Sequence, residues 1–243
     1  MNTGIEVIIQ ARMGSQRLPG KVMMDLCGKP VLWHVIERVK QSRFIQDIIV
    51  ATSDRESDDA IENFVVNLGM KAFRGSENNV LSRFFFAEKA YPAGTIVRIT
   101  ADCPLIDPRI IDQVVECYLN SPYEYVSNTG EKTTFPRGLD CEVFSSRLLE
   151  RAFYEATEDY EREHVTPFMY LKQDSVFQVK NKADYSDMRW TLDTFEDFQL
   201  IQAIYKHFYI DRHDFYMDDI YSFIAENPEI YQLNQHIKQK PIK

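Results

Sequence analysis

The stretch of the chain with the most evident chemistry is residues 10–21, which reads Gln-Ala-Arg-Met-Gly-Ser-Gln-Arg-Leu-Pro-Gly-Lys and follows a short apolar run. Its small residues let the backbone approach a ligand and offer N–H donors, and its cations attract phosphate. The composition favours a phosphate-binding loop but also suits an ordinary basic surface loop, since the stretch is neither a Walker loop nor a Gly-x-Gly-x-x-Gly fingerprint. The candidate nucleotide-binding residues here are Ala11, Arg12, Gly14, Ser15, Arg17 and Lys21.

Two aspartates that follow apolar runs are the candidate metal ligands. Asp102 comes directly after the run 95–100, and Asp193 after the run 188–192. Ligands of parallel sheets bind beyond the carboxyl ends of the strands, and Mg²⁺ takes carboxylate, phosphate and water oxygens. We therefore predict Mg²⁺ as the cofactor, with Asp102 as its main ligand, although a lone aspartate after a strand also suits a cap or turn. Asp193 repeats the arrangement of strand, aspartate and helix, which also suits helix capping by Asp193 or Thr194.

Two further polar segments follow strand-like runs, and the polar groups of the first could reach a base or ribose. Thr52 and Ser53 end the run 48–52, although this segment also suits a helix N-cap made by Asp54 or Ser57. Residues 74–83 begin Arg-Gly-Ser-Glu, where Gly75 permits close approach of a ligand to the backbone, although Ser76 or Asn78 could simply cap the helix that starts near Val80. The candidates in this second segment are Arg74, Gly75, Ser76 and Arg83.

Residues 135–144 are the best candidate for a second substrate site. Arg137 suits bidentate pairing with a carboxylate or phosphate. Asp140 and Glu142 alternate along an expected strand, so both face one side and suit sugar hydroxyls, or else form an exposed strand face. We assign no role to His34, and we expect His207, His213 and His236 at the surface.

Alternating strands and helices must position these residues. Apolar periodicity predicts buried strands at 5–9, 48–52, 71–73 and 95–100. Amphipathic helices are predicted between and after them, at 31–39, 60–68, 80–90 and 110–119. This order predicts an α/β fold with a mostly parallel sheet and helices on both faces. Residues 10–21, 52–55, 74–83 and 100–107 would then meet at one edge of the sheet.

The second half of the chain has a different pattern. We predict one domain over residues 1–243, with a substrate or dimerisation subdomain inserted at 123–182. That segment has short strand-like pieces at 125–127, 141–144 and 176–179 and helical stretches at 146–157 and 161–171. A returning strand at 188–192, a helix at 194–208 and two small helices within 217–237 complete the expected elements.

Composition excludes several other classes of protein. The formal net charge is −9 over 243 residues and the basic residues are scattered, which argues against a general nucleic-acid binder. No apolar run approaches the length of a membrane span, and the N-terminus has no secretory signal pattern. The four cysteines show no Cys-x-x-Cys spacing, which argues against zinc and suits free thiols. We therefore expect a cytoplasmic protein.

The loop 10–21 and the downstream Asp-Leu-Cys-Gly-Lys-Pro-Val-Leu resemble the cytidylyltransferases that activate sugar acids, such as the 3-deoxy-manno-octulosonate and acylneuraminate enzymes. The likeness is closest to the spore-coat polysaccharide biosynthesis protein F group. The segments Arg-Gly-Ser-Glu-x-x-Val-Leu-x-Arg and Asp-x-Pro-Leu-Ile also match. The resemblance implies a Rossmann-like fold of the nucleotide-diphospho-sugar transferase type and triphosphate binding by Arg12, Ser15, Arg17 and Lys21.

The same resemblance implies roles for residues further along the chain. Asp102 would bind the metal with Asp193, although Phe195 stands where a proline is common in the family. Thr52 and Ser53 would lie beside a cytosine, and the segment 74–83 would recognise base and ribose. His164 would touch the acceptor, with Arg189 as a further anion contact.

We therefore predict a Mg²⁺-dependent cytidylyltransferase that transfers CMP from CTP to a sugar or sugar acid in polysaccharide or glycoconjugate synthesis. Arg12, Lys21 and Asp102 are its predicted catalytic residues. A glycosyltransferase is the main alternative, but Asp102-Cys103-Pro104 lacks the Asp-x-Asp pair usual there. A sugar-phosphate nucleotidyltransferase that uses another NTP and a non-catalytic nucleotide-binding protein remain alternatives. We expect a homodimer.

Overall fold

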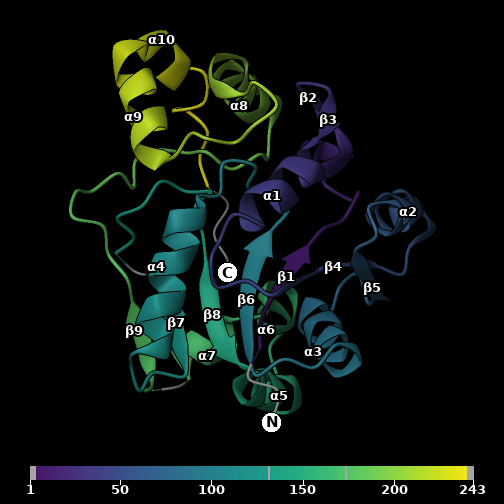
Figure 1. Ribbon diagram of the computed structural model, residues 1–243. Helices are drawn as coiled ribbons and strands as arrows, with labels where there is room; N and C mark the ends of the chain where they lie inside the picture. The colour runs from purple at the N-terminus through teal and green to yellow at the C-terminus, as the bar shows by residue number, and fades with distance from the viewer. Residues whose placement is uncertain (1–3, 131, 173, 240–243) are drawn as a thin grey trace.

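A parallel four-stranded core forms the centre of the protein (Figure 1). The structure is a computed structural model that describes residues 4–130, 132–172 and 174–239. Its central strands are β1 (Ile5–Gln10), β4 (Asp47–Ser53), β5 (Lys71–Gly75) and β6 (Thr95–Thr100), in the spatial order β5-β4-β1-β6. All three pairings are parallel, with Ile8 opposite Ile49 on one side and Arg98 on the other. The mostly parallel sheet predicted from the sequence is confirmed.

Three more strands extend the same sheet beyond β6. β8 (Glu142–Ser145) pairs antiparallel with β6, β7 (Tyr125–Ser127) pairs antiparallel with β8, and β9 (Val176–Gln178) runs parallel to β7. Within the described residues the sheet therefore has seven strands, and a separate two-stranded hairpin joins β2 (Asp25–Leu26) to β3 (Lys29–Pro30). The strands of segment 123–182 thus belong to the main sheet. That this segment binds the acceptor or a second copy stays a prediction.

Alternating side chains of the strands build a core on each face of the sheet. Val7 and Ile9 point to one face and Ile8 to the other, because successive strand residues alternate. The first face is covered by α1 (Val31–Val39), α2 (Asp59–Asn67), α4 (Pro108–Leu119), α8 (Phe195–Phe208) and α9 (Met217–Glu226). The second face is covered by α3 (Val80–Ala90), α5 (Ser146–Glu155) and α7 (Pro167–Leu171), with α6 (Asp159–His164) against α3.

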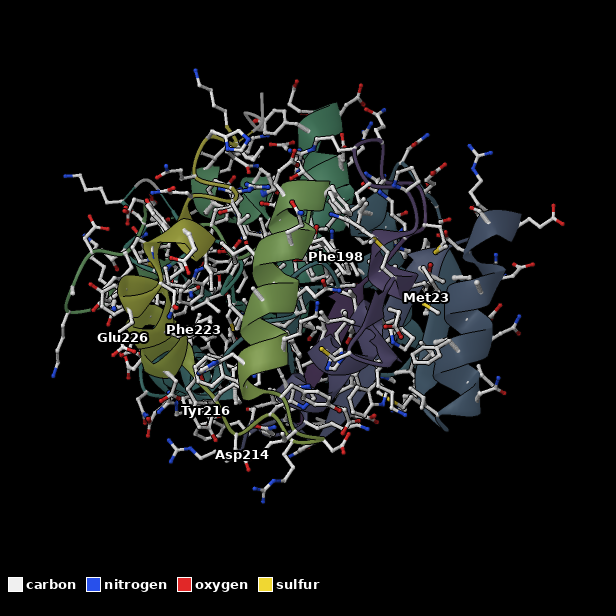
Figure 2. All side chains as sticks on the ribbon, turned by 90° about the horizontal axis from the view of Figure 1, so that it is seen from above. Met23, Phe198, Asp214, Tyr216, Phe223 and Glu226 are labelled. Carbon is white, nitrogen blue, oxygen red and sulfur yellow. The ribbon has the colours of Figure 1, made fainter. Side chains whose placement is uncertain are left out.

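The C-terminal helices gather at one end of the molecule. Figure 1 shows α8, α9 and α10 (Pro228–Tyr231) together beyond α1 and α4. From above, α8 lies between α9 and the N-terminal segment, with Phe198 on the side towards Met23 (Figure 2). No helix among the described residues is long and apolar enough to cross a membrane.

The structure differs from the expected elements in two places. Residues 188–192 form no strand, because only an isolated bridge joins Arg189 to Arg137 before Leu192 turns to donate its N–H to the Asp102 carbonyl. The helix expected at 161–171 divides into α6 and α7, since Val165 has a φ of 71° and Pro167 has no N–H with which to continue a helix.

One histidine expected at the surface is buried. His213 is only 4% exposed, and its Nε2 lies 2.8 Å from Nδ1 of the fully buried His34. Both rings pack against Trp33, Tyr205 and Tyr209. The sequence pattern missed this because the partners come from distant parts of the chain.

Candidate active site

Lys21 joins the two predicted metal ligands. Its ammonium group donates hydrogen bonds to Asp102 Oδ2 at 2.6 Å, to the Leu192 carbonyl oxygen at 2.7 Å and to Asp193 Oδ1 at 2.8 Å. Lys21 begins a short 3₁₀ turn, η1 (Lys21–Met23), directly after Gly20, whose φ of 69° lets the loop turn inwards. The sequence-predicted Lys21, Asp102 and Asp193 therefore lie together at the carboxyl edge of the sheet.

Backbone contacts bring the two aspartates together although they are far apart in the chain. Asp102 follows β6, and its carbonyl accepts the N–H of Leu192 at 2.7 Å. Thr194 then caps α8 in a capping box with Asp197. Asp193 is thus held between the Leu192–Asp102 hydrogen bond and the N-terminus of α8. Thr194 caps the helix as the sequence suggested, and this capping leaves the Asp193 side chain beside Lys21.

The side chain of Asp193 is also held by two arginines. Arg17 Nη2 lies 2.9 Å and Arg189 Nη2 lies 2.8 Å from Asp193 Oδ2. Arg189 is 7% exposed and pairs in addition with Asp197 and Gln239, so its guanidinium is committed to this network. The predicted contact of Arg189 with an acceptor anion has no support in this geometry, because Arg189 orients Asp193 instead.

Both aspartates are ionised at neutral pH. Burial alone would raise the pKa of Asp193, but Lys21, Arg189 and Arg17 outweigh it and lower that pKa to about 2. Burial likewise opposes ionisation of Asp102, yet Lys21 lowers its pKa. No group of three or more metal-ligating side chains exists among the described residues. Two anionic carboxylates fit Mg²⁺, which completes its shell with phosphate and water oxygens.

A buried carboxylate that the sequence analysis missed anchors the loop. Asp58 is 1% exposed, and its Oδ1 accepts the main-chain N–H of Met13 at 2.8 Å. Its Oδ2 accepts the hydroxyl groups of Thr52 at 3.0 Å and Ser53 at 2.6 Å. The predicted ligand residues Thr52 and Ser53 are therefore both buried and bound to Asp58. Residues 54–59 contain three aspartates, and nothing in their spacing distinguishes Asp58 from the others.

Arg83 is a buried cation beside the loop. It is 2% exposed, its Nη1 donates to the Ser76 carbonyl at 3.0 Å, and its Nε has no partner among the described residues. Burial and the nearby Arg12 lower its pKa to about 10. A Cβ on Gly75 would lie 3.3 Å from Arg83 Cγ. The structure thus brings Gly75, Ser76 and Arg83 together near Arg12, with one buried donor left for a ligand.

Arg74 is directed elsewhere. Its guanidinium pairs with Asp59 and Glu62 of α2, with Nη1 2.8 Å from Glu62 Oε2. It also donates to the carbonyl oxygens of Ser53 and Arg55. The structure does not group Arg74 with the loop cations, and its predicted contact with nucleotide has no support in this geometry.

The expected exposed strand face at 140–142 is not observed. Glu142 is 5% exposed and is paired with Arg98, and its Oε1 accepts hydrogen bonds from Tyr125 and Thr166, each at 2.6 Å. It is therefore not free to bind sugar hydroxyls. Asp140 precedes β8 rather than lying in it, and burial raises its pKa to about 6 despite Arg137 nearby.

The remaining acceptor candidates lie around this network. His164 ends α6, and burial lowers its pKa, with Arg98 and Arg12 among the charges that act on it. Arg137 is half-buried, and its backbone pairs with residues 188–190 through the Arg137 N–H and carbonyl. The charge of Arg98 acts on both His164 and Asp140, and Arg12 also acts on His164.

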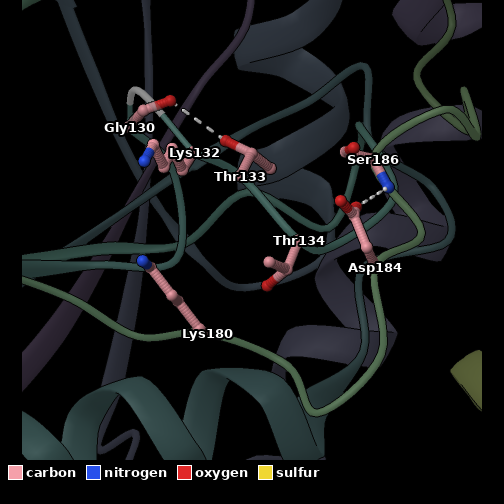
Figure 3. Close-up of a pocket in the computed structure, with 7 residues that line it drawn as sticks. All are labelled: Gly130, Lys132, Thr133, Thr134, Lys180, Asp184 and Ser186. Atoms are coloured by element: carbon pink, nitrogen blue, oxygen red, sulfur yellow. Dashed lines mark hydrogen bonds between the residues drawn. The ribbon is translucent and has the colours of Figure 1, made fainter.

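A separate surface cavity of about 540 Å³ is lined by residues within 130–134 and 180–186, apart from the site described above (Figure 3). None of its lining residues belongs to the predicted site. Its walls are held by a hydrogen bond from the Thr133 hydroxyl to the Gly130 carbonyl and one from the Ser186 N–H to Asp184. The lining residues are Gly130, Lys132, Thr133, Thr134, Lys180, Asp184 and Ser186.

Comparison with known proteins gives relatives along nearly the whole chain. The chain is 40% identical over 238 residues to an uncharacterised protein of Methanocaldococcus jannaschii, covering 96% of this chain and 95% of that protein. It is 35% identical over 235 residues to the spore coat polysaccharide biosynthesis protein SpsF of Bacillus subtilis, covering 91% and 94%. It is also 39% identical over 120 residues to the 3-deoxy-manno-octulosonate cytidylyltransferase of Trichlorobacter lovleyi, covering 49% and 46%.

Two solved structures are also similar to the chain. A cytidylyltransferase from Leptospira borgpetersenii has a TM-score of 0.89 at 36% identity, covering 98% of this chain and all (100%) of that one. A CMP:2-keto-3-deoxy-manno-octonic acid synthetase complexed with CTP shares the fold, with a TM-score of 0.65 at 17% identity over 84% of this chain and 99% of that one. The family model described as cytidylyltransferase matches residues 6–242. The chain therefore belongs to the cytidylyltransferase family of nucleotidyltransferases.

Proposed function

We propose that this enzyme transfers CMP from CTP to a sugar or sugar acid and releases pyrophosphate, with Mg²⁺ as cofactor. The observation that carries the proposal is the meeting of Lys21, at the end of the phosphate loop, with Asp102 and Asp193. The names of the relatives support the acceptor class, since several are cytidylyltransferases of octulosonate sugars. Synthesis of cell-surface polysaccharide or glycoconjugate is the corresponding role.

The chain's own residues account for nucleotide binding. Arg12 is exposed beside the loop and has no ion pair among the described residues, so its guanidinium is available to phosphate. Arg17 and Lys21 provide two more positive charges at the same edge of the sheet. These groups would neutralise the charge that develops on the departing pyrophosphate, which is the main demand of such transfers.

Asp102 and Asp193 would hold the Mg²⁺. When bound there, Mg²⁺ would neutralise phosphate oxygens and lower the pKa of the attacking hydroxyl. The acceptor would lie towards Asp140, Arg137 and His164. Arg137 and Asp102 act electrostatically on Asp140, and Arg12 acts on His164. Among the described residues, none of the three side chains is hydrogen-bonded to Glu142. A carboxylate of Asp140 suits hydrogen bonds from sugar hydroxyls.

Pyrophosphate release from each NTP, with Mg²⁺ and a panel of sugar acids, sugars and sugar phosphates, tests the proposal. We expect release with CTP and a sugar or sugar acid. Release with UTP or dTTP and a sugar phosphate would favour the alternative nucleotidyltransferase. Transfer from a nucleotide-sugar with no pyrophosphate from any NTP would support a glycosyltransferase and contradict the proposal.

Two substitutions connect the activity to this site. We expect Lys21→Ala and Asp102→Asn each to reduce kcat/KM by about 100-fold or more, since each removes charge stabilisation at the reacting phosphates. The exposed Lys40, which pairs only with Glu37 among the described residues, gives a matched control in Lys40→Ala. Near-normal turnover in either site variant with an intact fold would rule out this assignment.

We also propose a homodimer and a cytoplasmic location. Phe86 and Tyr154 are 50% and 72% exposed beside the stacked pair Phe85 and Phe153, and such clusters are typical of interfaces. All four cysteines are unpaired, which suits a reducing compartment. Sedimentation equilibrium of the wild type and of Tyr154→Glu tests the dimer, and a monomeric wild type would contradict it.

A further inference from the structure

We propose that Lys21 is an internal counterion that competes with the divalent cation for Asp102 and Asp193, so that the metal binds well only when the nucleotide draws Lys21 away. The inference rests on the proposed function, because it concerns the same carboxylates. It adds a regulatory property of the nucleotide-free enzyme, in which metal and nucleotide binding depend on one another.

The ammonium group of Lys21 is fully hydrogen-bonded within the protein. An ammonium group has three donors. All three are used inside the protein, on Asp102, Asp193 and the Leu192 carbonyl, at 2.6 to 2.8 Å. Lys21 is only 8% exposed. In this state Lys21 has no donor left for a phosphate oxygen, so binding of a triphosphate by Lys21 requires these bonds to break.

The positive charge of Lys21 occupies the position that a metal ion would take between Asp102 and Asp193. Lys21 contacts both carboxylates, whereas Arg17 and Arg189 contact only Asp193 of the two among the described residues. A divalent cation bound to the same two carboxylates would lie close to the ammonium group, and two positive charges at contact distance in a half-buried site repel strongly. The metal therefore has to displace Lys21, and a buried lysine without an anionic partner is unfavourable.

A triphosphate resolves this conflict. Its oxygens supply new anionic partners for Lys21, and the departure of Lys21 leaves Asp102 and Asp193 with less positive charge around them. Each ligand then favours the other, and the coupling is reciprocal by thermodynamic necessity. The nucleotide-free protein is consequently expected to bind the metal weakly.

The test is binding of Mn²⁺ alone to nucleotide-free protein, measured by electron paramagnetic resonance of free Mn²⁺ and by calorimetry. We expect Lys21→Met to bind Mn²⁺ at least about tenfold more tightly than the wild type, since the competing cation is gone. Arg17→Met is the matched control. It also removes one positive charge that contacts Asp193, but it leaves Lys21 in place between Asp102 and Asp193. We expect it to change Mn²⁺ affinity by no more than about threefold.

Thermal melting gives a second readout on the same proteins. Without metal, Lys21→Met should melt below the wild type because two carboxylates lose their shared partner. Saturating Mn²⁺ should recover most of this loss in Lys21→Met and raise the wild-type melting temperature little. Lys21→Arg, which keeps a cation, should retain weak Mn²⁺ binding and serves if the methionine variant does not fold.

The outcomes separate this inference from the proposed function. Equal Mn²⁺ affinity of the wild type and Lys21→Met would overturn the inference, as would a Lys21→Arg variant that binds Mn²⁺ much more tightly than the wild type. Either result could occur in an enzyme that releases pyrophosphate from CTP, and the proposed function would then stand alone. Tight Mn²⁺ binding by Lys21→Met that survives Asp102→Asn would also overturn the inference.

Discussion

The main-chain N–H of Met13 donates a hydrogen bond to Asp58 Oδ1 over 2.8 Å, which holds the loop 10–21 near the end of β4. Hydrogen bonds from Ser53, Met13 and Thr52 outweigh burial and lower the pKa of Asp58, so the anchor is an anion. The hydrogen bonds that Asp58 accepts within the described residues come from Met13, Thr52, Ser53 and Ser57, and not from the cations of the loop. Its effect on phosphate binding is therefore one of position.

We expect Asp58→Asn to raise the KM for CTP by about tenfold while kcat falls less, because the loop loses its fixed anchor but keeps its cations. Asparagine would place an amide N–H₂ donor in the site where the Asp58 carboxylate accepts hydrogen bonds from Thr52 and Ser53. Steady-state kinetics and thermal melting measure both effects. The exposed Glu56 provides the control in Glu56→Gln. A fall in kcat with unchanged KM would contradict a positioning role.

The parts of the fold that local periodicity determines were predictable. The bounds of α3 and β6 follow from apolar spacing alone, and Asp107 caps α4 through Arg109 as its place before Pro108 suggests. The place of Asp102 was also predictable, because ligand-binding residues follow the carboxyl ends of parallel strands and Asp102 follows β6. Asp193 reaches the same edge without a strand before it, through the hydrogen bond from the Leu192 N–H to the Asp102 carbonyl.

The remaining features depend on contacts between distant side chains. Nothing local to Glu142 reveals that Arg98, Tyr125 and Thr166 surround it, so an exposed face was equally consistent with its spacing. Lys21 was predicted to bind phosphate because no residue near it in the sequence is an obvious anionic partner. Its partners Asp102 and Asp193 lie 81 and 172 residues further along the chain. Side-chain direction, rather than residue type, was the missing information.

Arg74 and Arg83 were predicted to share a role, and the structure separates them. Arg74→Met should lower the free energy of unfolding by about 1 kcal/mol, since its pairs with Asp59 and Glu62 are partly exposed, and should leave the KM for CTP within about twofold. Arg83→Met should raise that KM by about tenfold, because it removes a buried donor near Arg12. The two variants are each other's control, and the reverse pattern would contradict this division.

Gly138 permits the close approach of two segments next to Asp193. Its φ is 103°, and a Cβ there would lie 2.6 Å from the Thr191 nitrogen and from the Trp190 carbonyl carbon. We expect Gly138→Ala to cost about 3 kcal/mol or more of stability and to displace the segment that carries Asp193. Gly28→Ala isolates the backbone strain, because Gly28 has a φ of 86° with no atom within 4 Å of the added Cβ. Equal losses in the two variants, measured by denaturant unfolding, would contradict the contact argument.

Glu6 makes stability depend on pH at the opposite end of the sheet. It is 4% exposed at the start of β1, and its Oε2 has no hydrogen-bond partner among the described residues. Burial raises its pKa from 4.5 to about 7, more than Lys71 at 3.7 Å lowers it. The folded state therefore holds this proton more tightly than the unfolded chain does, and ionisation destabilises the fold increasingly between pH 4.5 and 7.

Glu6→Gln keeps the shape of the side chain and removes the ionisation. We expect the variant to be more stable than the wild type by on the order of 1–2 kcal/mol above pH 7, which corresponds to a melting temperature roughly 2–8 °C higher. The difference should shrink as the pH falls and vanish below about pH 4.5, where Glu6 is protonated in both states. Thermal melting from pH 4 to 8 measures it, with Glu56→Gln as the exposed control. A stability difference that is constant across this range would show that Glu6 does not titrate as its burial requires.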